Sequence, residues 1–431
     1  RTSPHPVSDI GVLGVNVIAA EDGSVFFVQH LDNITEILAH ASQIVLVIGL
    51  EHMVRDREAA TFAARSQARY GALSVALCVS RRGNVDKGGI PAGQDHAPAP
   101  PDATVHEARA MEQRTDLSVI LLDNGRRAWL EDSRYRDLFL CIGCRACLLE
   151  CPTQPYYGEE TGWTPRDYLS SFLRGDNASL RDCIACGRCE ALCPLDIDLP
   201  TMISEAEAEA GAVTWQDQFY CRIGALFRAA SLTAPLSNRL FEWPLARGPM
   251  EWVSGMDRER QLPRFHRDTF VQQARRRAPR SAADRTVVYY PGCYANFTDP
   301  ALGWAVVGIL ERNRFEVIAP DHVCCGVASF SYGAKDLARH YARHTLEILG
   351  QLAHKGYTIL VSCPSCGMAL ERDFPHLLPE SKDARLVAEK TQDASDFLWA
   401  LHQAGELDTD LQPLDLRAGS HTPCRLRVRD L

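Results

Sequence analysis

Two runs of cysteine in this sequence share one spacing. Residues 141–152 read CIGCRACLLECP and residues 183–194 read CIACGRCEALCP. Both fit C-x2-C-x2-C-x3-C-P, in which three closely spaced thiolates ligate one 4Fe–4S cube. The fourth cysteine, followed by proline, is carried to the other cube. The spacing therefore predicts two cubes with crossed ligands, which is an arrangement suited to passing single electrons.

The crossed pattern assigns every cysteine of the two runs to a cluster. A pair of zinc ribbons is the alternative, because four-cysteine zinc sites also use C-x2-C pairs. The third cysteine at x2 and the trailing Cys-Pro in both copies favour iron–sulfur. We expect the first cluster on Cys141, Cys144, Cys147 and Cys193, and the second on Cys183, Cys186, Cys189 and Cys151.

A third group of cysteines follows the pattern C-x30-C-C-G-x36-C-x2-C. Its five thiols exceed the four that a cube requires, and adjacent cysteines do not easily bind one regular cube. Either one thiol is spare or the metal centre is unusual, and a zinc site or buried structural cysteines are the alternatives. The group consists of Cys293, Cys324, Cys325, Cys363 and Cys366, and Cys424 in SHTPCRL resembles the start of a second such set.

Two histidines stand next to these motifs, His322 before the cysteine pair and His421 in SHTPCRL. Either could donate a hydrogen bond to sulfur or carry a proton. A histidine whose nitrogens are satisfied elsewhere, with no such role, is the alternative interpretation.

The elements that must position the five cysteines form a strand–helix alternation from residue 286 onward. TVVYYP, FEVIAP and YTILVS read as strands that each run directly into cysteines, and a helix is expected over about 300–313. The spacing of about thirty to forty residues between strands suits βαβ units. Because the carboxyl ends of parallel strands share one sheet edge, we expect the five cysteines to converge there.

Upstream of the cysteine runs the pattern is β-rich. VNVIAA and SVFFVQ flank the turn EDG and predict a hairpin, and QIVLVIGL (43–50) predicts a buried strand. The Pro/Gly/Ala-rich stretch 82–112 reads as a linker. The predicted fold class is multidomain α/β and α. The expected domains are 1–81 (α/β), 82–112 (linker), 113–210 (helical, two clusters), 211–285 (helical connector and linker) and 286–431 (βαβ).

Composition narrows the functional classes. The 431 residues are 46% hydrophobic and carry a net charge of −9 with dispersed basic residues, which argues against a nucleic-acid partner. No apolar run approaches the roughly 18 residues of a spanning helix.

The grouped cysteines favour metal or redox work in a reducing compartment, hence the cytoplasm. No Gly-rich phosphate cradle is present, so we expect no tightly held flavin or NAD on this chain. The start without Met predicts a processed or truncated product.

The five-cysteine pattern resembles the cysteine-rich CCG domain of heterodisulfide reductase. It is also similar to the iron–sulfur subunits of glycolate oxidase and of anaerobic glycerol-3-phosphate dehydrogenase. The segments YYPGCYANFTDPALGWAVVGILERNRFEV, CCGVASFSYG, LVSCPSCGMALERDFPHLLP and HTPCRL follow the family order. The resemblance implies a third, non-cubane 4Fe–4S cluster on the five cysteines, with Cys424 opening a second motif, and it makes these thiols the candidate catalytic or terminal site.

The double run is similar to the helical ferredoxin domain of the same proteins. LSVILLDNGR before the first run and CPLDIDLPTMI after the second resemble lactate-utilisation protein B. The opening IGVLGVNVIAAEDGSVFFVQ resembles the later half of that protein's LUD domain, an α/β fold. Where that family commonly has Gly-Ile-Glu-Lys, this chain has Gly49-Leu50-Glu51-His52, and the first half of the domain is absent.

These resemblances imply an iron–sulfur electron-transfer subunit of an oxidoreductase that oxidises a small 2-hydroxy acid or glycerol 3-phosphate. The expected partners are a flavin-bearing dehydrogenase subunit or another redox subunit, with a quinone or a membrane-face partner as acceptor. The expected location is the cytoplasm, peripheral on the inner face of its membrane. One alternative is a disulfide reductase acting at the five-cysteine centre. The other is a zinc-stapled scaffold without redox function.

Residues 215–252 combine aromatic residues with arginines in a predicted helical segment. Such an amphipathic surface could rest on a membrane face or meet a quinone-reducing partner. Packing over a neighbouring domain is the interpretation that aromatic-rich helices more often satisfy. The residues are Trp215, Phe219, Tyr220, Phe227, Phe241, Trp243 and Trp252, with Arg222, Arg228, Arg239 and Arg247.

Overall fold

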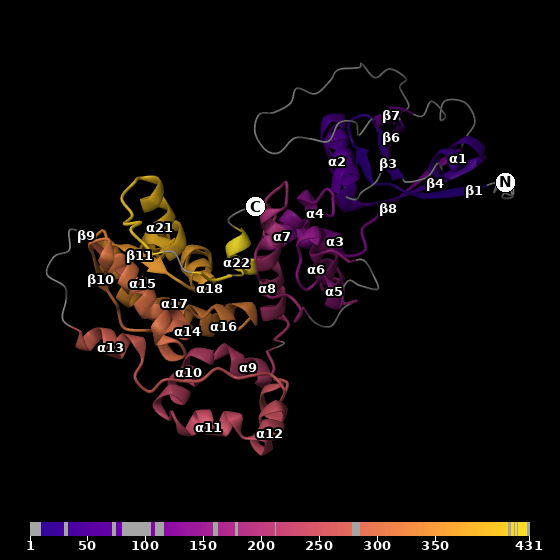
Figure 1. Cartoon of the computed structure of the whole chain (residues 1–431). Coiled ribbons are helices and arrows are strands. Elements are labelled where there is room, and N and C mark those ends of the chain that lie inside the picture. The colour runs from indigo at the N-terminus through magenta and orange to yellow at the C-terminus, as the bar shows by residue number, and fades with distance from the viewer. Residues whose placement is uncertain are drawn as a thin grey trace. The chain divides into compact units, whose positions relative to one another are not determined.

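The chain folds into helices and parallel sheets, as the expected mixed α/β class requires (Figure 1). The computed structural model describes residues 10–29, 33–70, 75–79, 105–107, 116–157, 163–176, 180–211, 213–277, 285–412, 415–417, 419 and 421–428. Its contacts divide the chain into two compact units. The first comprises residues 1–182 and 187–202, and the second comprises residues 183–186 and 203–431.

The first unit begins with two sheets. A parallel sheet has the order β1 (Ile10–Gly14), β4 (Gln43–Gly49), β8 (Asp116–Leu122). The other sheet has the order β5 (Met53–Val54), β2 (Val17–Ala19), β3 (Val25–Gln29), β6 (Val75–Val79), β7 (Val105–Glu107). The predicted hairpin is confirmed, because β2 and β3 pair antiparallel. The predicted buried strand is confirmed as β4, which alternates buried and half-buried residues.

Two helices and a 3₁₀ turn complete this part of the unit, namely α1 (Asn33–His40), α2 (Arg57–Tyr70) and η1 (Leu50–His52). The predicted linker 82–112 lies outside the described residues apart from 105–107, which form β7. Strand β8, just before the first cysteine run, pairs along its whole length with β4. The chain therefore returns to the N-terminal sheet immediately before it enters the cysteine-rich segment.

The segment with the two cysteine runs is made of short helices, as predicted. Among the described residues of this segment, only two helices exceed eight residues, because the cysteine loops interrupt the helical pattern. Helix α6 begins with a capping box in which Thr164 and Asp167 each bond the other's backbone N–H. The elements are α3 (Arg126–Glu131), η2 (Arg136–Leu140), α4 (Ala146–Leu149), α5 (Gln154–Tyr157), α6 (Pro165–Leu173), α7 (Arg188–Ala191) and α8 (Leu199–Glu209).

A helical connector opens the larger part of the second unit. It contains α9 (Trp215–Cys221), α10 (Ile223–Leu232), α11 (Leu236–Glu242), α12 (Pro244–Ser254) and α13 (Phe270–Arg276). Residues 278–284, in the linker expected at the end of 211–285, lie outside the described residues. None of the helices in the described part of the chain is long and apolar enough to cross a membrane.

The predicted βαβ pattern of the C-terminal part is confirmed. Four parallel strands have the order β10 (Phe315–Ile318), β9 (Arg285–Tyr290), β11 (Thr358–Val361), β12 (Thr391–Asp393). The predicted helix over 300–313 is α15 (Pro300–Arg312), and α17 (Lys335–His354) joins β10 to β11. Strand β12 was not predicted, because Thr391, Gln392 and Asp393 have no apolar pattern.

The strands of this sheet are apolar on both faces because helices cover both faces. On one face Val288, Tyr290 and Ile359 pack against residues of α17 and of α20 (Lys382–Lys390). On the other face Val287 and Leu360 pack against residues of α15 and of α21 (Ala394–Gln403). Figure 1 shows α15 and α17 beside the strands. This double coverage explains why the strands read as near-continuous apolar runs.

The strand order places a reversal of winding at the carboxyl edge of the sheet. The chain leaves β9 for β10 on one side and then returns to β11 on the other side of β9. The direction of winding therefore reverses between β9 and β11, and ligands of open α/β sheets bind at such points. Short helices follow these strand ends, namely α14 (Gly292–Phe297), α16 (Val327–Ser331) and α18 (Pro364–Met368), and the remaining turns are η3 (Ala369–Asp373), α19 (Phe374–Leu377) and α22 (Cys424–Arg427).

Candidate metal centres

The five cysteines of the C-terminal pattern converge at the carboxyl edge of the sheet, as the strand alternation predicted. Hydrogen bonds link their thiols in a chain, from Cys293 to Cys324, Cys325, Cys366 and Cys363 in that order. Cys293 follows β9 and Cys363 follows β11, so the thiols lie at the point where the winding reverses. Residues 73 positions apart in the chain thus share one site.

Backbone N–H groups point at these sulfurs. The N–H groups of Gly326 and Val327 donate to the sulfurs of Cys324 and Cys325. Those of Ser365 and Cys366, in the first turn of α18, donate to the Cys363 sulfur. Donors that face a sulfur favour its ionised form, which is the form that binds metal.

The five thiols divide into two ionisation classes. Hydrogen bonds from Cys293 and Cys325 lower the pKa of Cys324, and a hydrogen bond from Cys366 lowers the pKa of Cys363 to about 6. The same hydrogen bonds, together with burial, raise the pKa of the three donors Cys293, Cys325 and Cys366. The hydrogen bonds among the five thiols thus favour negative charge on part of the group, and the remaining protons would leave as a metal centre binds.

Two aromatic rings close one side of this site. The Tyr290 hydroxyl is buried and donates to the backbone carbonyl of Val323, and burial raises its pKa. The His322 ring lies 5.8 Å from the Tyr290 ring and 5.2 Å from the Phe297 ring. Burial lowers the pKa of His322 to about 4, and both of its ring nitrogens are buried with no hydrogen-bond partner among the described residues. His322 is therefore not a histidine satisfied elsewhere.

The predicted opening of a second motif lies next to the site as well. Cys424 begins α22, which packs against α18. Arg425 donates hydrogen bonds to the Ser331 hydroxyl at 3.1 Å and to the Ile184 carbonyl at 3.0 Å, and its charge lowers the pKa of Cys363. The second histidine beside a motif, His421, is exposed.

A close contact from the connector was not predicted from the sequence. Helix α10 approaches the five thiols so closely that a Cβ on Gly224 would lie 2.4 Å from the Cys324 Cβ and 2.9 Å from its Sγ. A glycine inside an apolar helix is a signal of close packing that could have pointed to this contact. Nothing in the sequence identified the partner, because Gly224 and Cys324 are 100 positions apart.

The two cysteine runs repeat one backbone conformation. In the first, Gly143 and Arg145 have positive φ of 68° and 62°. In the second, the corresponding Ala185 and Gly187 have φ of 48° and 86°. Alternating right- and left-handed residues turn successive N–H groups to one side and form a concave site for anions. The Gly143 N–H donates to the Cys141 sulfur at 3.4 Å, as expected for such a loop.

The cysteines predicted for the first cluster lie close together. Cys141 and Cys193 are near enough for each to influence the proton affinity of Cys144. Burial raises the pKa of Cys141 and raises that of Cys147 to about 12. The beginning of α6 covers Cys147, since the Thr164 hydroxyl and the Arg166 N–H bond its sulfur. Buried thiols with raised pKa values ionise only when a compensating cation binds.

The helical turns that follow the two runs pack against each other within the first unit. Helix α4 contacts α7, and an ion pair joins the buried Arg188 of the second run to the half-buried Glu150 of the first. The contacts group Cys183 and Cys186 with the second unit, whereas Cys189 and Cys151 belong to the first. The ligand set of the second cluster therefore stays a prediction.

Comparison with known families supports iron–sulfur chemistry for both regions. A family described as "Cysteine-rich domain" matches residues 287–371, and one described as "4Fe-4S dicluster domain" matches residues 140–198. The predicted iron–sulfur cofactors are confirmed at this level. Neither match reaches residues 1–81, so their resemblance to a LUD domain stays a prediction. The matched residues contain every cysteine of the three groups.

Curated relatives are iron–sulfur subunits of oxidoreductases. One subunit of the fumarate reductase (CoM/CoB) of Methanothermobacter marburgensis is 24% identical over 66% of this chain, which spans about half of that protein (51%). One subunit of the anaerobic glycerol-3-phosphate dehydrogenase of Escherichia coli K12 is 25% identical over 66% of this chain and 74% of its own length. One subunit of the dihydromethanophenazine:CoB–CoM heterodisulfide reductase of Methanosarcina barkeri is 23% identical, with 67% and 69% covered. No solved structure matches the chain.

The contact at Gly224 predicts the effect of one added methyl group. Gly224→Ala should lower the free energy of unfolding by about 1–3 kcal/mol, because its Cβ would overlap Cys324. The matched control is Gly248→Ala in α12, where a Cβ would meet nothing within 4 Å. That variant should gain up to about 1 kcal/mol from helix propensity. Urea denaturation measures both, and an equal gain in the two variants would contradict the close approach.

Proposed function

We propose that this chain is the iron–sulfur electron-transfer subunit of an oxidoreductase that oxidises a small 2-hydroxy acid, of the lactate or glycolate type, or glycerol 3-phosphate. The observation that carries the proposal is the gathering of cysteine thiols into sites lined by backbone N–H groups. In this scheme electrons arrive from a flavin-bearing partner subunit or from the five-cysteine centre. They cross two cubes and leave to a quinone or another carrier.

The substrate class rests on similarity and not on a pocket. One subunit of an anaerobic glycerol-3-phosphate dehydrogenase is among the relatives. The 2-hydroxy acid is suggested by the resemblance of LSVILLDNGR, CPLDIDLPTMI and the opening residues to lactate-utilisation protein B. In either case the partner subunit would perform the oxidation, and this chain would accept the electrons one at a time.

For the first cube we propose the ligands Cys141, Cys144, Cys147 and Cys193. The proximity of Cys193 to Cys141 and Cys144 supports the crossed arrangement, since Cys193 comes from the other run. For the second cube we propose the following ligands by the same rule: Cys183, Cys186, Cys189 and Cys151. The packing of α4 against α7 supports this exchange of fourth ligands.

For the five-cysteine centre we propose a third, non-cubane 4Fe–4S cluster. Such a cluster would supply a site that exchanges electrons and can bond a substrate sulfur. The chain's own contribution is to hold the five sulfurs at the sheet edge, to donate N–H groups to them, and to shield them with Tyr290 and His322. Cys424, at the start of α22, would be an additional ligand through the packing of α22 on α18.

A second candidate function is reduction of a disulfide at the five-cysteine centre. Similarity to one subunit of a CoB–CoM heterodisulfide reductase favours it, as does the lowered pKa of Cys324 among raised neighbours. The reaction would take two electrons from the cubes and two protons from water, break the S–S bond and release two thiols. A zinc-stapled scaffold without redox function finds no support among the relatives, which are named for redox reactions.

For the electron acceptor we propose a site at the membrane face, with the connector as the contact surface. The rings of Phe227 and Phe241 pack on Phe265, which agrees with the packing interpretation for these two aromatics. The rings of Trp215 and Trp252 instead lie 6.0 Å apart in solvent. Six large apolar side chains of the connector are each more than half exposed, namely Trp215, Leu232, Leu236, Trp243, Leu245 and Trp252.

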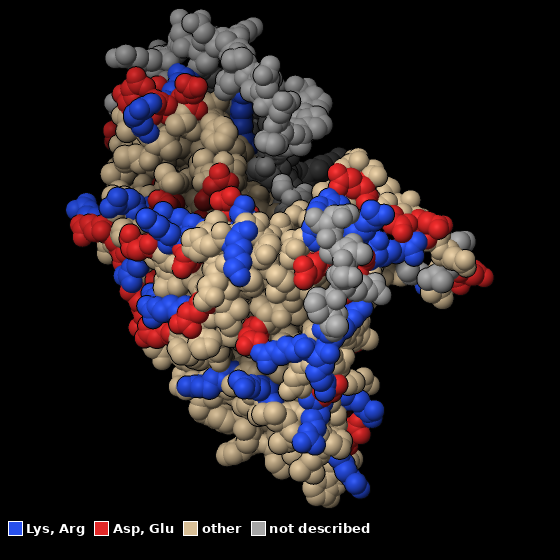
Figure 2. Space-filling model, turned by 90° about the vertical axis from the view of Figure 1, so that its left-hand side faces the viewer, with Lys and Arg blue, Asp and Glu red and all other residues tan. Residues whose placement is uncertain are grey.

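The charge of this surface suits an anionic bilayer. Residues 222–254 contain four arginines and two glutamates, in a chain whose net charge is −9. Arg228 and Arg239 are exposed, and Glu242 is paired with Arg264 at 2.6 Å. On the face shown in Figure 2, basic side chains outnumber acidic ones in the lowest part of the molecule, and uncharged residues lie between them. Exposed tryptophans with basic residues are typical of helices that lie in a bilayer interface. The enzyme would therefore work on the cytoplasmic face of the membrane.

Metal and sulfide analysis with EPR on anaerobically purified protein tests the cluster assignment. We expect about twelve irons per chain if all three sites are filled, and about eight if only the cubes are. Crossed ligands predict that the double variant Cys141→Ser/Cys193→Ser loses one cube, whereas Cys183→Ser/Cys193→Ser loses both. Uncrossed ligands predict the reverse. Cys221→Ser, at a buried thiol outside the three groups, is the control and should keep all iron.

Zinc without sulfide in the wild-type protein would refute the electron-transfer function altogether. To separate the two redox functions, we would offer the CoB–CoM heterodisulfide to the protein reduced with a viologen dye. We expect the dye to stay reduced for an electron-transfer subunit, because such a chain would not cleave the disulfide that is offered. Steady dye oxidation with release of two thiols per disulfide, abolished by Cys324→Ser, would establish the second candidate function instead.

Vesicle flotation tests the contact surface. The protein should float with vesicles containing anionic lipid and not with neutral phosphatidylcholine vesicles, and binding should weaken as salt is raised. Trp243→Ser/Trp252→Ser should bind on the order of tenfold or more weakly, since two interfacial anchors are lost. The control is Trp399→Ser, which should bind normally. Trp399 lies in α21, outside the connector, and its exposure of 60% is between those of Trp243 and Trp252. Equal binding by all three proteins would contradict the assignment.

A further inference from the structure

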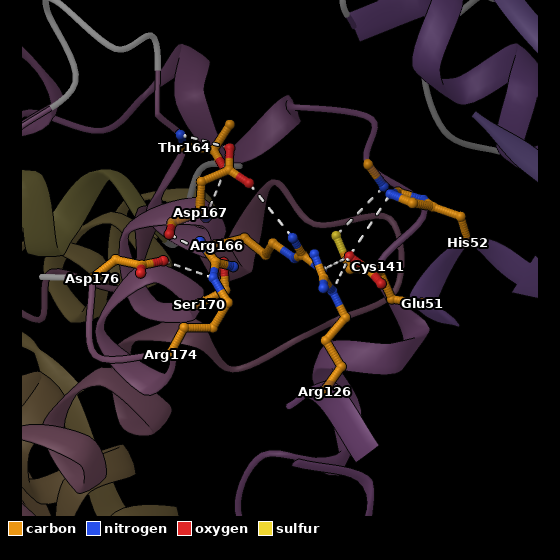
Figure 3. A network of polar contacts seen from close by, with 11 residues as sticks. Glu51, His52, Arg126, Cys141, Thr164, Arg166, Asp167, Ser170, Arg174 and Asp176 are labelled. Carbon is orange, nitrogen blue, oxygen red and sulfur yellow. Dashed lines mark hydrogen bonds and ion pairs between the residues drawn. The ribbon is translucent and has the colours of Figure 1, made fainter. Parts of the chain in front are cut away.

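A buried network of charges lies beside the first cysteine run. The Glu51 carboxylate, only 4% exposed, accepts a hydrogen bond from Arg126 Nε at 2.7 Å. Arg166 Nη2 donates to the same oxygen at 3.4 Å. Figure 3 shows the Cys141 sulfur among the side chains of Arg166, Glu51 and His52. Arg166 also pairs with Asp167 at 3.6 Å, so two arginines face two carboxylates. Of these charges, that of Arg166 favours a negative charge on the Cys141 sulfur.

Side chains from the N-terminal elements surround this run. We call Glu51, His52 and Gln67 the N-terminal wall. Gln67 of α2 donates to the Ile142 carbonyl at 2.5 Å. A Cβ on Gly143 would lie 3.4 Å from Gln67 Nε2 and 3.5 Å from His52 Cε1, and Ile142 packs against the small-residue core of α2. Residues that precede the first cysteine by more than seventy positions therefore line the loop that holds it.

Several polar atoms of this wall and of the adjacent Arg166 have no hydrogen-bond partner among the described residues. Arg166 Nε, Glu51 Oε2, His52 Nδ1 and Gln67 Oε1 are buried, and none has a hydrogen-bond partner among the described residues. A buried polar atom without a partner costs roughly 1–3 kcal/mol, so four in one place call for a missing group. A 4Fe–4S cube on Cys141 would place an anion with acceptor sulfides beside the free N–H of Arg166. Arg166 therefore fits the cluster proposed for this position, whereas Glu51 Oε2 and Gln67 Oε1 are acceptors that need a donor such as water.

We propose that Arg166 sets the reduction potential of the cube held by the first run, and that Glu51 and Arg126 fix the position and net charge of Arg166. This inference rests on the proposed function, in which Cys141 ligates a cube. Reduction adds one negative charge to an anionic cluster. A buried cation at its side stabilises the reduced form more than the oxidised form, and low local polarity leaves this effect poorly screened. Glu51, with the opposite charge, offsets part of the effect.

The placement of Arg166 on α6 strengthens the same effect. Arg166 is the second residue of the helix, and its N–H donates to the Cys147 sulfur. The side chain and the amino end of the helix thus offer positive charge to the same site. In this arrangement the N-terminal α/β elements take part in electron transfer by tuning a cluster, without a substrate site of their own.

Redox titrations followed by EPR on the full chain test the inference with variants of opposite sign. Arg166→Gln should lower the potential of one cube, with an equilibrium change of about tenfold, or about 59 mV for a one-electron couple. Glu51→Gln should raise the potential of the same cube by a similar amount. Arg174→Gln, at the other end of α6 where Arg174 pairs with exposed Asp176 at 2.8 Å, is the control and should shift nothing.

The outcomes separate a tuning role from a packing role. Shifts of the same sign in both variants, or no shift in either, would overturn the inference, because packing defects do not follow the sign of the removed charge. If Arg166→Gln fails to assemble the cube, Arg166→Lys keeps the charge and should hold the potential near wild type, and Glu51→Gln remains decisive. A wild-type protein without cube signals would refute the proposed function, whereas cubes with unshifted potentials would refute this inference alone.

Discussion

Burial opposes the charge that the cysteines of this chain must carry. A thiolate binds iron and a thiol does not, but burial raises the pKa of Cys141, Cys144 and Cys147. Each metal centre therefore needs nearby groups that favour negative charge on sulfur. The fold supplies them as backbone N–H groups, helix amino ends and buried arginines. The conformation of the cysteine loops, the placement of the helices and the N-terminal wall all contribute such groups.

The two halves of the chain meet the requirement in different ways. In the double run, three cysteines within seven residues wrap a loop whose N–H groups turn inward, so that most of the site is local. At the sheet edge the thiols come from three strand ends, and the turns that follow β10 and β11 add N–H groups that donate to the sulfurs. The first solution gives compact sites that exchange electrons. The second gives a site at the point where the winding of the sheet reverses, which is where ligands of open α/β sheets bind.

The connector brings the sheet-edge site close to the exposed surface proposed to contact the membrane. Helix α10 places Gly224 against Cys324, and Phe227 of the same helix packs with Cys293 in the core beside it. The exposed tryptophans belong to α9 and to the turn and helix that follow α11. One short group of helices thus contacts Cys324 and Cys293 on one side and presents exposed apolar and basic residues elsewhere on its surface. Electron tunnelling favours short separations, so this arrangement suits exchange with an acceptor at that surface.

The sequence alone determined the features that depend on short-range spacing. The two cysteine runs, the hairpin, and the strand–helix alternation after residue 286 were predictable, because covalent spacing and hydrophobic periodicity act within one element. The convergence of the five thiols was predictable as well, since parallel strands must share an edge. Tertiary structure alone decided that β8 returns to β4, that β12 joins the sheet, and that Glu51, Gln67 and Gly224 contact the cysteine loops. The contacts of Glu51 with Arg126, of Gln67 with Ile142 and of Gly224 with Cys324 join residues 75 or more positions apart. All of these pairings depend on how whole elements pack, which no local pattern encodes.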